Sequence, residues 1–304
     1  MKKILLMLLF TISMITLMGC GEEETPLSVM VPSGSPALAA IWIKDNPQYA
    51  VDIVNGADSL VAAFGAGSHD IIFAPTNLGA KLIASGIEYV FAATVVWGNY
   101  YMVSTGQVDF TLASLEGKTI TVFGQNQTSD LIVRYLLATN EIDVTFVYVD
   151  SVATAAALFQ NDPTSIVLTA EPTLAVLQSV VSGLQVIDLQ AEYALLTGDD
   201  AYPQAGVFVK SELDHENVDA FLSDLADSVA QVNTDPISAG VKANAMGYGF
   251  SAEILALAVP TSHLVYTTAL ASKEALEAYF TLILAMNPSL IGGALPSEAF
   301  YYQP

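Results

Sequence analysis

Short strand-like runs alternate with helical stretches over the first two thirds of the chain, and this alternation limits the possible folds more than any other feature. The runs are rich in β-branched and aromatic residues, and the clearest lie at 27–31, 71–74, 119–123, 144–149 and 166–170. Strands that alternate with helices form parallel sheets covered by helices on both faces. We therefore predict an α/β fold. After Lys210 the apolar residues recur at helical spacing, so only helices are expected there.

The strand and helix units fall into two blocks. The second block begins near Gly106 with LEGKTITVFG, and AGVFVK after Pro203 returns to the first. The chain is long enough for two bodies of ordinary domain size. We predict lobe 1 from residues 27–104 plus 205–304 and lobe 2 from residues 105–204, with crossings near 104–106 and 202–204.

The N-terminus has the order of a secretory signal. Lys2 and Lys3 precede an apolar run, and a small glycine stands before Cys20. The run is shorter than the ~20 residues of a comfortable membrane span, so a signal peptide at 1–19 is preferred over a permanent helix. The stretch LMGC at 17–20 resembles the lipobox of bacterial lipoproteins, which implies cleavage before Cys20 and lipid attached to it; a plain signal peptide is the alternative. Residues 20–26 would then form an acidic, solvated tether.

Charge and composition exclude several classes of function. The formal net charge is −22 and Arg134 is the only arginine, so neither nucleic acid nor anionic lipid is an expected partner, and membrane attachment would be through the N-terminal lipid only. The single cysteine allows no disulfide, and the three scattered histidines make no metal-ligand set. No phosphate loop with Gly-Lys-Ser/Thr and no Gly-x-Ser-x-Gly elbow occurs. We expect no metal, no cofactor and no enzyme, although a Ser–His–Asp arrangement stays open.

Four segments in fixed order resemble the solute-binding proteins of bacterial ABC importers, in particular the type-2 group that binds nitrate, sulfonate, taurine and thiamine precursors. The segments are VNGADSLVAAFGAGSHDIIFAPTNLGAKLI, SLEGKTITVFG, TAEPTLAVL and YPQAGVFVKSEL. The resemblance covers most of residues 27–245. It implies the two-lobe type-2 periplasmic-binding-protein fold, or Venus flytrap, in which each lobe is a mixed, mostly parallel sheet flanked by helices. It also implies a monomer outside the cytoplasm that closes over a small molecule and docks on a permease with its ATPase.

The candidate ligand-binding residues follow the predicted strands, because ligands of open α/β sheets lie beyond the carboxyl ends of the strands. Each segment also has an ordinary structural reading as a helix cap, a turn or a packed aromatic. The candidates are Ser33, Gly34, Ser35, Thr76, Asn77, Trp97, Asn99, Tyr100, Gln125, Asn126, Thr128, Ser129, Glu171 and Gln204.

The same residues indicate the class of ligand. Trp97 and one of Tyr100 and Tyr101 could form a wall against a flat molecule, and Glu171 could accept from a ring N–H or an amine. Few lysines or arginines lie near the cleft, which disfavours an anion held by ion pairs. We predict a neutral or cationic heterocycle, such as a vitamin precursor. The alternatives are an oxyanion held by helix amides, a cofactor-biosynthesis enzyme on the same scaffold, and a sensory or adhesive lipoprotein.

Overall fold

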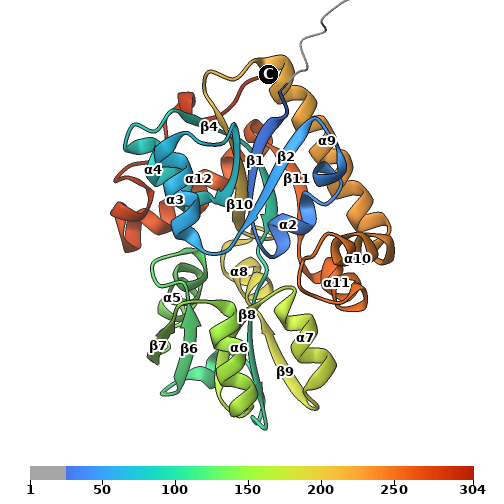
Figure 1. The fold of residues 1–304 in the computed structure, drawn as a ribbon. Coiled ribbons are helices and arrows are strands. Elements are labelled where there is room, and N and C mark those ends of the chain that lie inside the picture. The colour runs from blue at the N-terminus through green and yellow to red at the C-terminus, as the bar shows by residue number, and fades with distance from the viewer. Residues whose placement is uncertain (1–24) are drawn as a thin grey trace, which may run out of the picture.

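The computed structural model describes residues 25–304 as two lobes, each built on its own sheet (Figure 1). The predicted signal peptide, Cys20 and most of the predicted tether lie outside the described residues. β1 starts near the C-terminus, at the end of the larger lobe that points away from the smaller one. Within residues 25–304, every helix is too short or too polar to cross a membrane.

The first lobe contains a six-stranded sheet in the order β11-β4-β10-β3-β1-β2. Helices pack on both of its faces, as expected for strands that read as continuous apolar runs. Its strands are β1 (Leu27–Pro32), β2 (Tyr49–Val54), β3 (Ile71–Pro75), β4 (Tyr89–Trp97), β10 (Pro203–Lys210) and β11 (Leu264–Thr268). Its α-helices are α2 (Ser35–Ala39), α3 (Ala57–Ala66), α4 (Thr76–Ala84), α9 (His215–Thr234), α10 (Pro236–Ala245), α11 (Ala252–Ala258) and α12 (Ala269–Met286).

The second lobe contains a five-stranded sheet in the order β7-β6-β8-β5-β9. Its strands are β5 (Tyr100–Thr105), β6 (Thr119–Phe123), β7 (Thr145–Val149), β8 (Ile166–Ala170) and β9 (Leu184–Asp188). Its helices are α5 (Thr128–Thr139), α6 (Val152–Asn161), α7 (Thr173–Val180) and α8 (Leu189–Thr197). The predicted α/β fold with two lobes is therefore confirmed.

Each sheet receives one antiparallel strand at the point where the chain arrives from the other lobe. β10 lies between β3 and β4 and runs antiparallel to both. β5 lies between β8 and β9 and is likewise antiparallel to both. The parallel pairs are β1 with β2 and β3, and β6 with β7 and β8. Each sheet is thus mixed, and its parallel strands direct their carboxyl ends toward the other lobe.

The first crossing lies earlier than the predicted boundary at 104/105. β5 belongs to the second sheet, so the chain leaves the first lobe at Gly98 and Asn99. Both residues have positive φ, 95° and 98°, and this left-handed backbone redirects the chain between β4 and β5. The sequence signals a break there, but two strands joined by a short turn resemble a hairpin within one lobe. The second crossing follows α8 and ends where β10 begins at Pro203.

The prediction of helices only after Lys210 is wrong at β11. This strand pairs antiparallel with β4 and extends the first sheet at its edge. Close aromatic packing surrounds the neighbouring β4, where the ring of Phe91 stacks on that of Phe300 at 5.5 Å. The C-terminal residues thus cover the first sheet and bury its aromatic core.

A glycine in α10 fixes the approach of α10 to α11. A Cβ atom at Gly240 would lie 2.2 Å from the backbone oxygen of Ala252, which cannot move without displacing α11. We expect Gly240→Ala to lower the free energy of unfolding by about 1–3 kcal/mol in urea denaturation. Gly65→Ala in α3 is the matched control, because a Cβ there meets nothing within 4 Å. The control should raise stability by about 0.5–1 kcal/mol, and equal effects would contradict this account of the packing.

Candidate functional site

Polar side chains from both lobes are buried where the lobes meet. Ser35 and Asn77 come from the first lobe, Asn99 from the crossing, and Thr128 and Glu171 from the second lobe. Their exposed fractions are at most 5 %, which is unusual for such residue types. We call these residues, together with the polar groups that they contact across the two lobes, the interlobe layer. Buried polar groups are costly unless they are paired, so their hydrogen bonds decide what the layer can do.

Asn99 connects the two lobes through its side chain. Its Nδ2 donates to Ser35 Oγ at 2.8 Å, and its Oδ1 accepts from the backbone N–H of Glu171 at 2.8 Å. Ser35 opens α2 directly after β1, and Glu171 follows β8, so each partner stands at the carboxyl end of a strand. The predicted candidates Ser35, Asn99 and Glu171 therefore meet in one place. Gly34 lies beside them, with a hypothetical Cβ 3.8 Å from the Glu171 carbonyl oxygen.

Two further hydrogen bonds between candidates cross the layer. Thr128 Oγ1 donates to Asn77 Oδ1 at 3.0 Å, which joins the start of α5 to the first turn of α4. Gln204 Nε2 donates to the hydroxyl of Tyr100 at 2.9 Å and so joins β10 to β5. Thr76 is buried as well, but its Oγ1 donates to the backbone oxygen of Pro203 within the first lobe at 2.6 Å.

Glu171 is the buried carboxyl group of the layer. Its Oε1 accepts from Thr261 Oγ1 of the first lobe at 2.6 Å, and its Oε2 accepts from the backbone N–H of Ala175 at 3.1 Å. Desolvation by burial raises the pKa of Glu171 to about 7, although both hydrogen bonds act to lower it. Burial thus favours the neutral form of this carboxyl group up to a higher pH than in water.

Other candidates contact only their own lobe. The exposed Ser33 donates to Asn55 Oδ1 at 2.7 Å, and Trp97 Nε1 donates to the backbone oxygen of Val265 at 3.1 Å. The indole of Trp97 is therefore tied to β11, at the edge of the first sheet.

The loop before α5 is organised within the second lobe. Gln125 and Asn126 are exposed, and the backbone N–H of Asn126 donates to Asp130 Oδ2 at 2.8 Å. Ser129 is buried and donates to the backbone oxygen of Phe123 at 2.7 Å. Arg134 pairs with Asp130 at 2.8 Å, which leaves this guanidinium engaged on its own helix.

Several residues of the layer were not found from the sequence. The Tyr101 hydroxyl donates to the backbone oxygen of Thr261 at 2.7 Å and lies 3.1 Å from Nε2 of His263. Desolvation lowers the pKa of His263, which favours the neutral imidazole. The pair Tyr100–Tyr101 was the available signal, because alternation along a strand directs the two side chains to opposite faces. No local pattern marked Thr261, which belongs to a region that reads as helical.

Gln190 of α8 supports the crossing from the second lobe. Its Oε1 accepts from the backbone N–H of Tyr100 at 2.7 Å and from the Tyr202 hydroxyl at 2.6 Å, so it contacts both crossing segments. A Cβ at Gly98 would lie 2.0 Å from Cγ of Gln190, and the crossing therefore needs glycine at this position.

Buried tyrosines continue the layer on the side of α12. The ring of Tyr202 stacks on that of Tyr100 at 6.2 Å and lies 6.2 Å from that of Tyr279. Among residues 25–304, Gln204 Oε1 and the Tyr279 hydroxyl are buried and have no hydrogen-bond partner. Thr128 lies near the Tyr279 hydroxyl and lowers its pKa against the larger effect of burial, but no hydrogen bond of normal geometry joins the two side chains.

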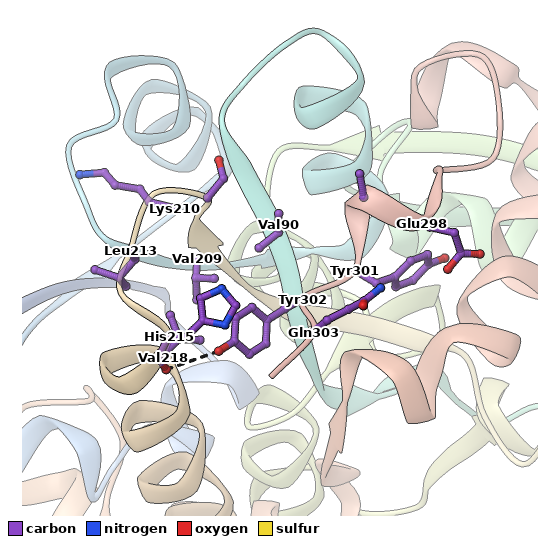
Figure 2. A pocket seen from close by; sticks show the side chains of 12 residues that line it. Val90, Val209, Lys210, Leu213, His215, Val218, Glu298, Tyr301, Tyr302 and Gln303 are labelled. Carbon is purple, nitrogen blue, oxygen red and sulfur yellow. Dashed lines mark hydrogen bonds between the residues drawn. The ribbon is translucent and has the colours of Figure 1, made fainter.

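A cavity of about 290 Å³ lies elsewhere, beside the C-terminal residues (Figure 2). It is lined by β4, β10, the start of α9 and the segment 298–303. Tyr302 closes one side, where its hydroxyl donates to Asp219 Oδ1 at 2.8 Å. This cavity is at the outer end of the first lobe and contains none of the candidate residues.

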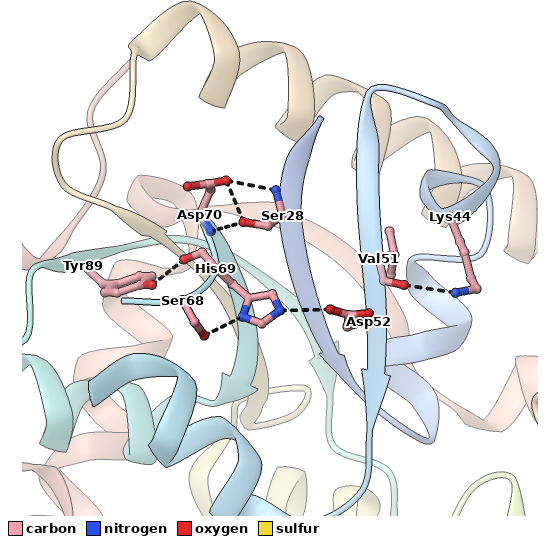
Figure 3. A network of polar contacts seen from close by, with 8 residues as sticks. All are labelled: Ser28, Lys44, Val51, Asp52, Ser68, His69, Asp70 and Tyr89. Atoms are coloured by element: carbon pink, nitrogen blue, oxygen red, sulfur yellow. Dashed lines mark hydrogen bonds and ion pairs between the residues drawn. The ribbon is translucent and has the colours of Figure 1, made fainter. Parts of the chain in front are cut away.

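A serine, a histidine and an aspartate are in contact on the first lobe (Figure 3). His69 Nδ1 lies 2.8 Å from Ser68 Oγ, and its Nε2 lies 3.2 Å from Asp52 Oδ2. Asp70 accepts from the backbone N–H and the hydroxyl of Ser28, at 2.9 and 2.7 Å. These contacts tie the amino ends of β1 and β3 together, at the opposite end of the sheet from the interlobe layer. Within the described residues, no group of three or more His, Cys, Asp or Glu could hold a metal ion.

Comparison with known proteins finds solved structures of the same fold. No protein-family model matches the sequence, and no curated protein does. An ABC transporter structure from Parabacteroides distasonis superimposes with a TM-score of 0.82 at 22 % identity, over 92 % of this chain and 99 % of the other. The fold is that of periplasmic binding proteins.

Two further solved structures have the same fold. A ligand-binding component of an ABC-type import system from Staphylococcus aureus, with zinc bound, gives a TM-score of 0.70 at 15 % identity, over 92 % of this chain and 97 % of that one. The periplasmic aliphatic sulphonate binding protein from Escherichia coli gives 0.70 at 14 %, over 92 % and 93 % of the two chains.

The burial of Glu171 predicts a pH dependence of stability. Its pKa is raised from 4.5 to about 7 on folding, so the unfolded chain loses this proton first as the pH rises. The free energy of unfolding should therefore fall between pH 4.5 and about 7, by up to about 3 kcal/mol. Glu171→Gln should remove this component in urea titrations at several pH values. The exposed Glu212→Gln variant serves as the control and should keep the wild-type profile; an unchanged profile in Glu171→Gln would contradict the prediction.

Proposed function

We propose that this protein is the extracytoplasmic substrate-binding lipoprotein of an ABC importer and captures a small organic solute between its two lobes. The observation that carries the proposal is the buried interlobe layer, to which both lobes contribute polar groups at the carboxyl ends of their strands. Ligands of open α/β sheets bind at such ends. The binding components among the fold neighbours support the same reading.

The proposed mechanism is closure about the two crossings. Opening at Gly98–Asn99 and before Pro203 separates the two sheets and exposes the layer to solvent. A ligand that contacts both lobes has higher affinity for the closed state, and this difference supplies the free energy of closure. Delivery to a permease with its ATPase follows, so the chain needs no catalytic residue and acts as a monomer.

The charges around the layer support a neutral or cationic ligand, such as a heterocyclic vitamin precursor. Within residues 25–304, each lysine and the arginine either contacts a residue outside the layer or is exposed. The contacts are Lys44 with Val51, Lys210 with Asp70, Lys242 with Asp45, Lys273 with Glu298 and Arg134 with Asp130, and the exposed residues are Lys81 and Lys118. An anion would therefore meet no cation in the layer. Aromatic rings are available there for a flat solute.

An oxyanion is the second candidate, since one fold neighbour is a sulphonate binding protein and helix amides alone can hold such a group. A cofactor-biosynthesis enzyme on this scaffold is less well supported, because the predicted signal at 1–19 directs the chain out of the cytoplasm. Lipid on Cys20 would hold the protein at the bacterial cell membrane, and the acidic tether would lead to β1 at the outer end of the first lobe.

A panel of small metabolites, screened by the shift in unfolding temperature, tests the function. A solute that binds only the folded chain should stabilise it by about 2.7 kcal/mol at a hundredfold excess over its Kd. Thr128→Val should reduce this shift, because the variant loses the hydroxyl that joins α5 to α4. Thr145→Val, at an exposed position of β7, should keep it. If no solute stabilises the wild type, or if both variants respond as the wild type does, the proposal fails.

A further inference from the structure

Two polar atoms of the interlobe layer have no partner, and they lie on one side of it. Gln204 Oε1 and the Tyr279 hydroxyl are buried without a hydrogen bond among the described residues. They belong to β10 and α12, which are distant in the chain. Gln204 donates to the Tyr100 hydroxyl at 2.9 Å, and the ring of Tyr279 lies 6.2 Å from that of Tyr202, which stacks on Tyr100. An unmade hydrogen bond of a buried group is costly, and a ligand that completes it is one explanation.

The free atoms define a complementary set. Gln204 Oε1 accepts, and the Tyr279 hydroxyl can donate or accept. Tyr100 accepts from Gln204, and among the described residues no acceptor takes its proton. If the Gln204 amide is turned over, the Tyr100 hydroxyl donates to the amide oxygen and the amide nitrogen is free. A donor and an acceptor are then again left without a partner. In either orientation a ligand that pairs with these residues must offer both a donor and an acceptor.

The charged groups near this set are already engaged. Both oxygens of Glu171 accept from protein groups, Thr261 and Ala175. Asp188 Oδ1 accepts from the side chain of Gln190 and from backbone N–H groups at the start of α8. Burial of Glu171 also favours its neutral form. A cationic ligand would thus find both oxygens of Glu171 already bonded, and an anionic one would find no lysine or arginine.

We propose that Gln204 and Tyr279 are the specificity-determining residues of the site and that they select an uncharged solute with both an N–H donor and a carbonyl-type acceptor, as in a carboxamide, a lactam or a pyrimidine. This inference rests on the proposed function and narrows its ligand from neutral or cationic to neutral. Tyr279 belongs to α12, a segment in which the sequence predicted a helix and no binding residue.

The first arm of the test needs no ligand. Tyr279→Phe removes a hydroxyl that has no partner, so the unfolding temperature of the ligand-free protein should stay the same or rise. Tyr248→Phe is the matched control, because the buried Tyr248 hydroxyl donates to the backbone oxygen of Ala37 at 2.7 Å. That variant should unfold at a lower temperature. Equal losses in the two variants would show that Tyr279 has a structural partner and would overturn the inference.

The second arm uses calorimetry with two pairs of compounds added to the metabolite panel. Nicotinamide is compared with nicotinate, and methanesulfonamide with methanesulfonate, so that the members of each pair have similar shape and different charge. We expect uncharged amide-type members to bind, and Tyr279→Phe to weaken them about tenfold or more while Tyr248→Phe does not. Binding of charged members alone would overturn the inference and leave the proposed function intact, as would hits that Tyr279→Phe leaves unchanged. Binding of no member would count against both.

Discussion

The two hydrogen bonds of the Asn99 side chain hold the two lobes together at the first crossing. They join the start of α2 to the end of β8, from a residue whose own backbone carries the chain from one sheet to the other. Because the Asn99 side chain is fixed at the crossing, a change in the backbone of the hinge also changes the hydrogen bonds of the interlobe layer. If either bond breaks, a buried amide loses a partner, so opening and closing should be cooperative.

The layer is polar and buried, and this combination has consequences for recognition. Its groups mostly satisfy one another, and the few that remain free lie beside the stacked tyrosines. A molecule that completes these bonds gains more than it would in water, because the low local dielectric strengthens each contact. A molecule that leaves them unmade is penalised, and selectivity arises from that difference.

The sequence predicted the layers of the fold because strand and helix periodicities are local. It also identified Ser35, Asn99, Glu171 and Gln204 as candidates, because each follows a predicted strand or lies at a crossing. Their binding role remains a prediction. It could not place the first crossing, since a strand, a turn and a strand have the same pattern within one lobe or between two. Thr261 and Tyr279 reach the layer only through tertiary packing, and their neighbours in sequence read as ordinary helix.

Hinge closure can be measured directly by electron–electron double resonance between nitroxides on the exposed positions Val61→Cys of the first lobe and Leu158→Cys of the second, with Cys20→Ser as background. The account predicts that Asn99→Gly, which keeps the positive φ and removes both bonds, lengthens the distance between the labels, and that a ligand from the panel shortens it again. One narrow distance, unchanged by the variant and by the ligand, would contradict the account.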